Sequence, residues 1–451
     1  MGAKTLFSSI SGLNDEKQMI HICDVLCTGV SHEKVNSGFV YGLRLAFPDE
    51  KIKIYADKQH IDAIISVLKN DGITINNLEY CPIHVSSEQS VFFYLKCYFL
   101  IRNIFRQVLR SGDSKIFFLS FNNIILQIIK KLKCNSLFSR FRFVLVLHGS
   151  FEEIAGAVSA PKMLAVPSIS LTKRLKRYSL RSLPEKAMKL ITRRLLEIYH
   201  NRIAPLFSKP LVLKDLLHLN HSSDFRYIAL STHIVENARK YIDVEKLNIH
   251  VITMPTVFHP AYKVEGNQYP KFAIFGYGNS IMSHQILTKL SSFGLTDPYE
   301  IRNIGMNNLG VEGFSNVTIT STENRLSRSE MEAHARDIDI FLILHPGNTY
   351  KLCCSASIFE ALSYQKPILH FDNDCINTYN TREMPIGLSA TTIEEFVDNM
   401  VNIIKNYDTF LSDRDVFISN IGKLRDDYSI EKSKEDISKV YRWPDEVERP
   451  N

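Results

Sequence analysis

The sequence predicts an α/β fold with two doubly wound parallel sheets, one after the other along the chain. Short apolar strands alternate with helical patterns of ten or more residues over residues 19–147, and the alternation resumes at Lys271. Such alternation is typical of parallel sheets, whose strands are connected through helices. A chain of 451 residues, 45% of them hydrophobic, is long enough to build two separate cores.

The first sheet is predicted from five strands that are separated by helices. The strands are expected at Met19–Leu26, Lys51–Ala56, Asn77–Pro82, Lys115–Ser120 and Arg142–Leu147. The helices between them are expected at Ser37–Phe47, Ile61–Lys69, residues 89–111 and Asn122–Lys133. Because buried parallel strands are apolar on both faces, these continuous apolar runs favour a sheet covered by helices on each side.

The regular alternation stops at about residue 155. Residues 155–220 are basic and contain five prolines, so we interpret them as a helical insertion within the first domain. Alternation then returns with a strand, a helix and a strand at Phe225–Leu230, Thr232–Tyr241 and His250–Thr253. Met254-Pro255 marks the end of a first domain spanning residues 1–255, because proline restricts both itself and its predecessor.

The second domain is predicted over residues 256–428, beginning with a linker to residue 270. Strands are expected at Phe272–Phe275, Glu300–Ile304, Val317–Ser321, Ile338–Leu344 and Ile368–Phe371. Helices are expected at Met282–Phe293, Ser329–Arg336, a short segment from Ser355, and Thr391–Tyr407. A charged helix from Ser429 to Tyr441 belongs to a terminal segment, residues 429–451.

One segment of the second domain carries the strongest functional signal. A buried strand runs through a polar loop into a helix that begins at Ser355, and this is where open α/β sheets bind phosphates. The free N–H groups of Ser355, Ala356 and Ser357 suit a diphosphate. Glu360 lies three residues after Ser357 and therefore on the same helix face. The alternative is an ordinary strand–helix–strand unit with a solvated glutamate.

These residues resemble a known family. Tyr350, Ser355, Ser357, Glu360-Ala361-Leu362 and Lys366-Pro367-Ile368 are similar to the donor-binding signature of nucleotide-sugar glycosyltransferases of the GT-B fold, which act in bacterial surface-polysaccharide synthesis. The resemblance implies two Rossmann-like domains that face a central cleft. It also implies that Glu360 binds the nucleotide ribose and that the terminal helix returns toward the first domain.

The resemblance implies further donor contacts. Gly276, Gly278 and Asn279 form a loop between a strand and a helix, which in the resembled fold touches the donor phosphates, although a simple tight turn is an equal alternative. Lys351 lies in the donor loop, and Arg325 lies in a loop that often reads the base. The chain departs from the family at Leu352, where many retaining members have a second glutamate, so the stereochemical outcome stays open.

Candidates for catalysis lie on loops that follow strands of the first domain, where open sheets place their sites. His148 follows the strand that ends at Leu147 and is the best candidate, because histidine transfers protons near neutral pH. Glu152 and Glu153 are candidate bases, with first-turn helix acids as the alternative. His32 and Glu33 follow the first strand, where a capped loop residue is the alternative.

Charge is divided unequally along the chain. The net charge is +6, but residues 1–250 hold 35 Lys and Arg against 21 Asp and Glu, and the remainder is acidic. The basic residues concentrate in residues 101–145 and 172–202, which indicates an anionic surface as partner, with a solvated basic face as the alternative.

Composition restricts compartment and cofactor. The eight cysteines have no ligand spacing, which is typical of a reduced, cytoplasmic protein. Asp337 and Asp339 lead straight into a strand rather than an open metal loop, so no metal and no other cofactor is expected. No targeting segment is predicted, and residues 91–109 are interrupted by three cations, so this helix is expected to be buried or to lie on a surface.

Together these expectations describe a metal-independent hexosyltransferase peripheral to the inner face of the cell membrane, with no nucleic-acid partner. It would transfer sugar from a nucleotide donor to a lipid-linked or growing polysaccharide acceptor, as in capsule or lipopolysaccharide synthesis. The alternatives are a nucleotide-sugar epimerase of the same fold and a non-catalytic polyanion-binding protein. The base, sugar, linkage and oligomeric state are not specified by the sequence.

Overall fold

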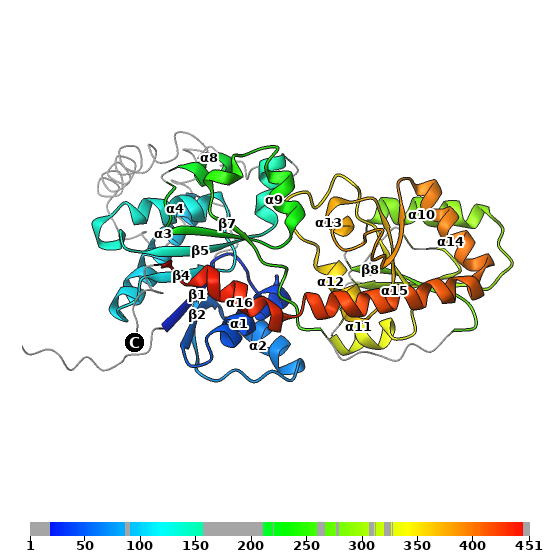
Figure 1. Ribbon diagram of the computed structural model, residues 1–451, viewed down its shortest axis with the longest axis horizontal. Coiled ribbons are helices and arrows are strands. Elements are labelled where there is room, and N and C mark those ends of the chain that lie inside the picture. Colours follow the sequence, from blue (N-terminus) through cyan, green and yellow to red (C-terminus); the bar gives the residue numbers. More distant parts are fainter. Residues whose placement is uncertain are drawn as a thin grey trace, which may run out of the picture.

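Two parallel sheets, each covered by helices, form the two halves of the molecule (Figure 1). The computed structural model describes residues 19–85, 91–156, 211–219, 221–258, 267–276, 279–305, 311, 313–319, 326 and 328–444. The predicted fold class is confirmed, since every strand pair within both sheets is parallel. Most of the predicted basic insertion, including residues 172–202, lies outside the described residues.

The first sheet has seven strands in the order β3-β2-β1-β4-β5-β6-β7. They are β1 (Met19–Cys23), β2 (Lys51–Asp57), β3 (Leu78–Ile83), β4 (Lys115–Phe118), β5 (Arg142–Leu147), β6 (Phe225–Ala229) and β7 (Ile249–Val251). The strand order reverses between β1 and β4, and the carboxyl ends at such a reversal are where open sheets bind ligands.

Helices of the first domain cover both faces of this sheet. They are α1 (Glu33–Ala46), α2 (Lys58–Asn70), α3 (Val91–Arg110), α4 (Asn123–Lys133), α8 (Leu213–His218) and α9 (Thr232–Ala238), with short 3-10 turns η1 (Ser136–Phe138), η2 (Gly149–Ala155) and η4 (Val244–Lys246). Helix α1 begins four residues earlier than predicted, directly after His32, because the loop that precedes it is shorter than the polar sequence indicated.

The second sheet has six strands in the order β10-β9-β8-β11-β12-β13. They are β8 (Lys271–Gly276), β9 (Glu300–Gly305), β10 (Val317–Ile319), β11 (Ile340–Ile343), β12 (Ile368–Phe371) and β13 (Gly387–Ala390). The sequence did not predict β13. It is only four residues long, and two of its four residues are glycine and serine, which have low strand propensity.

Seven helices follow β7 in the described chain. They are α10 (Ser280–Ser292), α11 (Arg328–Ala335), α12 (Ala356–Ser363), α13 (Asp374–Asn377), α14 (Ile393–Lys405), α15 (Tyr407–Asp427) and α16 (Ile430–Tyr441). The sequence also missed α15, whose 21 residues include five Asp and carry a weak apolar stripe. Helix α15 leads directly to α16, which packs on α1 in the first domain (Figure 1).

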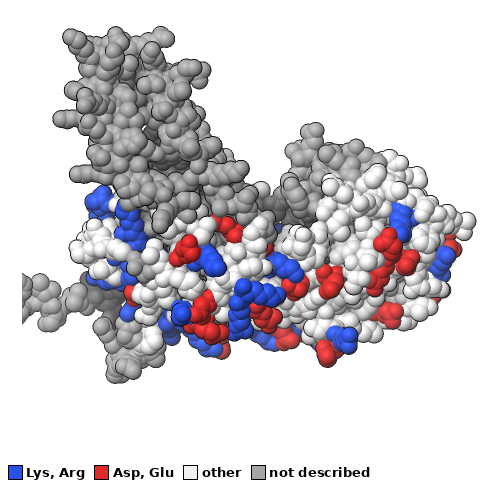
Figure 2. All heavy atoms as spheres, turned by 90° about the horizontal axis from the view of Figure 1, so that it is seen from above, with Lys and Arg blue, Asp and Glu red and all other residues white. Residues whose placement is uncertain are grey.

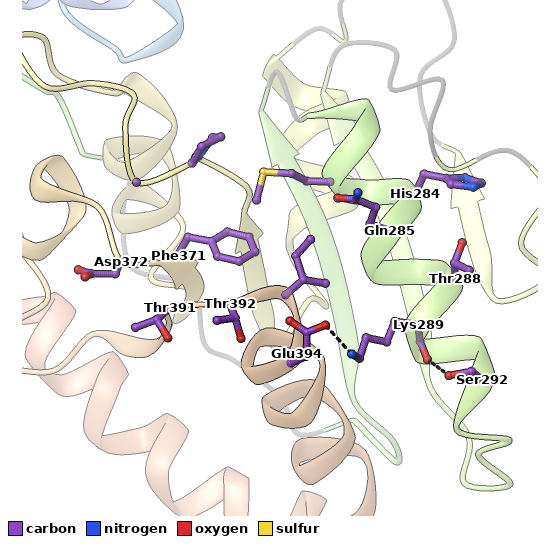
Figure 3. Close-up of a pocket in the computed structure, with 14 residues that line it drawn as sticks. His284, Gln285, Thr288, Lys289, Ser292, Phe371, Asp372, Thr391, Thr392 and Glu394 are labelled. Atoms are coloured by element: carbon purple, nitrogen blue, oxygen red, sulfur yellow. Dashed lines mark hydrogen bonds and ion pairs between the residues drawn. The ribbon is translucent and has the colours of Figure 1, made fainter. Parts of the chain in front are cut away.

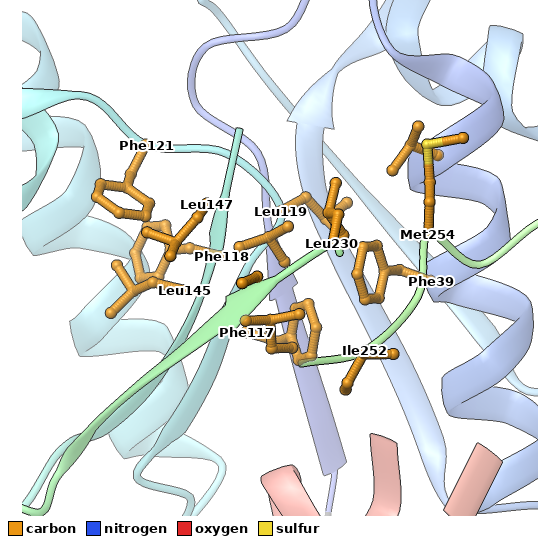
Figure 4. Packing of buried hydrophobic residues seen from close by; sticks show 14 of the residues in the cluster. Phe39, Phe117, Phe118, Leu119, Phe121, Leu145, Leu147, Leu230, Ile252 and Met254 are labelled. Carbon is orange, nitrogen blue, oxygen red and sulfur yellow. The ribbon is translucent and has the colours of Figure 1, made fainter. Parts of the chain in front are cut away.

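Buried side chains join the two halves. In the first domain Phe39 of α1, Phe117 of β4 and Met254 belong to one continuous core (Figure 4), and the same core extends to Phe359 of α12. Gly38 makes the close approach possible, since a Cβ atom there would lie 2.1 Å from the carbonyl oxygen of Pro255. Thr256 also forms an isolated parallel bridge with Ser429, so the two segments that cross between domains lie side by side.

Candidate active site between the two domains

A buried carboxylate organises the carboxyl edge of the first sheet. Asp24 follows β1 and is fully buried. Its carboxylate accepts hydrogen bonds from Ser120 Oγ (2.6 Å), which follows β4, and from Asn36 Nδ2 of α1 (2.8 Å). Backbone N–H groups of Cys27 and Leu26 donate at 2.9 and 3.1 Å. The Asp24 carboxylate therefore connects the segments that follow β1 and β4, the strands between which the strand order reverses.

Electrostatics keep this group ionised. Burial alone would raise the pKa of the Asp24 carboxyl group, but hydrogen bonds from His60, Ser120 and the Cys27 N–H outweigh it and lower the pKa well below its ordinary value. Burial lowers the pKa of His60, yet the hydrogen bond and charge of Asp24 overcome this and raise it. His60 donates from Nδ1 to the carbonyl oxygen of Gly29 at 2.8 Å, which fixes the ring.

Asp24, Cys27 and His60 form the one group among the described residues whose side-chain atoms are close enough to hold a metal ion. The amide nitrogen of Asn36 lies 2.8 Å from Asp24 Oδ2 and 2.9 Å from His60 Nε2. The Asn36 amide therefore contacts the same carboxylate and imidazole atoms that an ion would coordinate. We interpret the group as a hydrogen-bonded network that positions the loops around it.

The two predicted catalytic histidines lie against each other at this edge. The ring centroids of His32 and His148 are 4.9 Å apart, although the residues follow different strands, β1 and β5. His148 is 8% exposed, and its Nε2 has no hydrogen-bond partner in the described part of the chain. Burial, followed by the charge of His32, lowers the pKa of His148 to about 3, and burial also lowers the pKa of His32. Both imidazoles are therefore neutral at neutral pH.

The predicted acidic candidates differ in surroundings. Glu152 lies in η2 and is buried, and one carboxylate oxygen accepts a hydrogen bond from the Leu352 N–H of the second domain at 2.6 Å. Glu153 is half-buried, and burial raises the pKa of its carboxyl group. Glu33 is the first residue of α1 and is also buried.

The loop from β11 to α12 is held by first-domain side chains at four consecutive residues. His233, at the start of α9, donates from Nε2 toward the carbonyl oxygens of Tyr350 and Cys353, both at 3.1 Å. Ser231 Oγ, 2.8 Å from Nδ1, orients the ring. With Nε2 bonded to carbonyl oxygens, His233 must carry its proton there and accept at Nδ1.

The remaining two loop residues are held in the same way. Glu152 binds the N–H of Leu352, as described above, and Asn237 of α9 donates to the carbonyl oxygen of Lys351 at 3.1 Å. Asn237 also donates to Asp374 at 2.9 Å, and Asp374 pairs with the ammonium of Lys351 at 2.7 Å. The conformation of the predicted donor loop therefore depends on the first domain.

This loop is also strained. Tyr350 has a φ of 56°, in the left-handed region that favours glycine, and its ring lies 4.4 Å from that of His345. Asn373 donates to the carbonyl oxygens of Pro346 and Thr349 at 2.9 and 3.0 Å, which supports the first turn of the loop. Residues kept in such conformations persist only where neighbours hold them, and they are common at ligand sites.

The beginning of α12 has no side-chain cap. Ser355 precedes the helix but its hydroxyl group instead contacts His345 Nε2 at 2.8 Å, so no side chain occupies the helix N-terminus. Ala356 is exposed and Ser357 is half-buried. Glu360 lies one turn into the helix and forms an ion pair with Lys34 of α1, so its carboxylate faces the first domain.

A small cavity surrounds this ion pair. Its lining combines α1, the crossing segment Met254–Val257 and α12, and its volume is about 40 Å³. Because about 10–15 Å³ of such space is enough for one water molecule, the cavity has room for a few waters but not for a ribose. A ribose at Glu360 would therefore require Lys34 and Glu360 to separate.

A larger cavity of about 870 Å³ opens at the carboxyl edge of the second sheet (Figure 3). It is lined by α10, the start of α14 and the ends of β11, β12 and β13, and Lys289 pairs with Glu394 across one side at 2.7 Å. Pro346 and Gly347, at the start of the predicted donor loop, line it as well. The same loop thus begins at the large cavity and leads to the small one.

The glycine loop is only partly described. Gly276 ends β8, whereas Gly278 and Arg325 lie outside the described residues. Asn279 caps α10, because its side chain accepts a hydrogen bond from the Met282 N–H at 3.2 Å. This cap is the ordinary structural role of asparagine at a helix start.

Sequence reasoning missed the residues that hold the loops in place: Asp24, His60, His233, Asn237 and Asp374. One signal was available, since Asp24 follows directly after a buried strand at the edge where open sheets place ligands. The others are polar residues of helices that meet only after the chain folds.

Comparisons with known proteins identify the fold. No family model and no curated protein matches the chain. Solved structures do match over nearly its whole length. A glycosyltransferase from Rickettsia africae covers 96% of this chain and 100% of its own, with 12% identity and a TM-score of 0.55. The lipopolysaccharide outer core galactosyltransferase WaaB covers 94% and 99%, with 10% identity and a TM-score of 0.53. Anabaena HepE in complex with UDP covers 94% of this chain and 99% of its own, with 12% identity and a TM-score of 0.53. The chain has the GT-B glycosyltransferase fold.

Proposed function

We propose that this protein is a glycosyltransferase that transfers a hexose-type sugar from a nucleoside-diphosphate sugar to a lipid-linked or growing surface polysaccharide. The observation that carries the proposal is the donor loop, held between two domains of GT-B arrangement with Glu360 facing the first domain. The second domain binds the donor and the first binds the acceptor. We further propose that the protein works at the inner face of the cell membrane.

The donor diphosphate is assigned to the start of α12. The N–H groups there have no side-chain cap, and the positive end of the helix dipole favours an anion. Glu360 accepts the ribose hydroxyl groups, one turn further along. Lys34 and Lys351 supply cations close to the leaving diphosphate, whose negative charge grows as the glycosidic bond breaks.

The acceptor side is assigned to the carboxyl edge of the first sheet. His32 and His148 are neutral imidazoles and so retain a lone pair for the acceptor proton or a sugar hydroxyl group. Glu152 is engaged with the Leu352 N–H, so we propose that it positions the donor loop. No step in this scheme requires a metal ion.

Binding of nucleoside diphosphates tests the proposal. HepE was solved with UDP, so UDP is the first of a panel to be titrated by calorimetry. Wild-type protein is expected to bind one of them, and Glu360→Gln is expected to weaken binding by at least about tenfold, because a ribose hydrogen bond to a charged group is lost. Glu383→Gln, at an exposed residue with no ion pair in the described structure, is the matched control.

Three outcomes would contradict the proposal. Absence of binding to every nucleoside diphosphate would favour a protein without this chemistry, such as a polyanion-binding module. Equal affinity of the wild type and Glu360→Gln would remove Glu360 from the site. Conversion of a free nucleotide sugar without any acceptor would instead identify an epimerase.

A further inference from the structure

The basic residues of 101–145 are of two kinds: some are bound to other parts of the protein, and others are exposed without an ion pair in the described structure. Four of these residues support the fold. Lys130 donates to the carbonyl oxygens of Leu217 and Leu219, and Lys133 donates to two carbonyl oxygens and pairs with Asp224 at 2.9 Å. Lys115 lies 4.9 Å from the ring of Tyr441, and Arg142 lies 5.4 Å from Trp443. These four cations are accounted for by the core and the terminal helix.

Three of the five remaining basic residues of 101–145 lie on α3, and Lys96 of the same helix adds a fourth cation. Residues Lys96, Phe99, Asn103, Arg106 and Arg110 are exposed and follow the three- and four-residue spacing of a single helix face, and Arg102 borders it. We call these six residues the α3 face. Phe99 lies in the middle of the face with 60% of its surface exposed.

The α3 face has no internal charge compensation. The 20 residues of α3 contain four cations and neither Asp nor Glu. In the described structure none of the four cations forms an ion pair, and the acidic residue that follows the helix, Asp113, is buried and bonded to His21. Figure 2 shows Lys and Arg side chains at the first-domain end of the molecule, at the left.

The opposite face of α3 anchors the helix in the protein. Ile101, Ile104, Phe105 and Val108 are all buried in the first-domain core. No helix in the described ranges is long and apolar enough to cross a membrane. Helix α3 can therefore meet a lipid surface only along its side, with the core face held by the protein and the cationic face outward.

We propose that the α3 face is the surface by which this protein docks on an anionic lipid bilayer. The cations meet acidic headgroups, and Phe99 enters the boundary between headgroups and acyl chains, which aromatic side chains favour. The proposal specifies the membrane partner of the proposed function, but it rests on the exposed residues of α3 and not on donor chemistry.

The position of α3 relates docking to the cleft. The helix follows β3 and precedes β4, so it runs antiparallel to both strands and begins at the carboxyl edge of the first sheet. That edge also carries Asp24, His32 and His148. A bilayer lying along α3 therefore approaches the end of the domain at which a lipid-linked acceptor would enter.

Vesicle flotation with the full chain tests the proposal. Phosphatidylglycerol vesicles are compared with neutral phosphatidylcholine vesicles at about 50 mM salt, where headgroup attraction is weakly screened. Wild-type protein is expected to bind the anionic vesicles and not the neutral ones. The triple variant Arg102→Gln, Arg106→Gln and Arg110→Gln is expected to weaken binding on the order of 100-fold, since each basic residue near the surface contributes about fivefold.

A second variant separates lipid from other polyanions. Phe99→Ser is expected to weaken vesicle binding roughly tenfold by loss of apolar burial, while affinity for heparin stays unchanged. Matched controls on other helices are the triple variant Lys405→Gln, Lys423→Gln and Lys434→Gln, on α14, α15 and α16, and the exposed apolar change Val416→Ser on α15. These controls are expected to bind vesicles as the wild type does.

Three results would overturn the proposal. They are failure of the wild type to bind anionic vesicles, unchanged vesicle binding by the α3 triple variant, and parallel loss of heparin and vesicle binding by Phe99→Ser. Circular dichroism and thermal unfolding verify that each variant is folded. Calorimetry with nucleoside diphosphates tests the proposed function independently, because no residue of the α3 face contacts the donor loop in the described structure.

Discussion

The ammonium group of Lys34 and the carboxylate of Glu360 form an ion pair that joins α1 of the first domain to α12 of the second. Glu360 is the residue to which we assign the nucleotide ribose, so its partner in the ligand-free protein is a cation that the ribose must replace. Lys34 and Glu360 are 31% and 16% exposed, which places the pair between a surface and a buried salt bridge.

We expect Lys34→Met and Glu360→Gln to be non-additive. Because the pair is partly exposed, the coupling free energy should be about 0.5–1 kcal/mol. Urea unfolding of the wild type, both single variants and the double variant measures this coupling. Additive losses would show that the two charges do not interact in solution.

Glu152 is expected to control the conformation of the donor loop. Glu152→Ala leaves the buried N–H of Leu352 without its acceptor, at a cost of about 1–3 kcal/mol. Hydrogen exchange of residues 349–355 should become faster, while Glu152→Gln, which keeps an acceptor oxygen, should restore part of the protection. Unchanged exchange in Glu152→Ala would mean that His233 and Asn237 suffice to hold the loop.

Removal of the Asp24 charge is expected to destabilise the first domain. Asp24→Asn replaces an acceptor that meets several donors, and the loss should be on the order of 3–5 kcal/mol, as for other disrupted buried charges. The same change should lower the pKa of His60, which NMR titration of the ring measures. A His60 pKa equal to that of the wild type would show that the charge of Asp24 does not affect His60.

Stability is expected to fall on acidification between about pH 6.5 and pH 4. Burial, followed by the charge of His370, lowers the pKa of His345 to about 4, and burial lowers the pKa of His370 to about 4. In this pH interval the two histidines are protonated in the unfolded chain but stay neutral in the folded chain, so the free energy of unfolding falls. Each unit of pKa difference corresponds to about 1.4 kcal/mol of that free energy. Melting temperature against pH should fall less steeply in His370→Gln, and an equal slope would contradict the assignment.

Arg226 is expected to fasten the terminal helix. Its guanidinium group donates to the carbonyl oxygens of Lys439, Val440 and Arg442, and stacks 4.2 Å from the ring of Trp443. Arg226→Met should therefore release α16 and expose it to limited proteolysis, while Arg239→Met, at an exposed surface pair, should not. Resistance of Arg226→Met to cleavage would show that packing of α16 on α1 is sufficient.

The sequence by itself determined the layered fold and the position of the loop between β11 and α12, to which we assign the donor. Continuous apolar runs such as Ile340–Ile343 and Ile368–Phe371 can be recognised from the sequence alone. Strands buried on both faces are apolar at every position and do not alternate between apolar and polar residues. Likewise Glu360 follows its strand and helix start at a spacing that is visible without any tertiary contact. By contrast α15 was missed, since much of its sequence is polar and local propensity gives little indication of what it packs against.

Only the tertiary structure decided how the two domains are joined at the site. Glu152 binds an N–H group 200 residues later in the chain, and His233 and Asn237 bind carbonyl groups of the same loop from a different domain. These partners are backbone atoms, which every residue has, so no pattern of side chains in the sequence predicts them. The tertiary structure also decided which basic residues of 101–145 support the fold and which belong to the α3 face. The sequence shows that a residue is charged, but only the fold shows whether an acidic group or a carbonyl oxygen lies next to it.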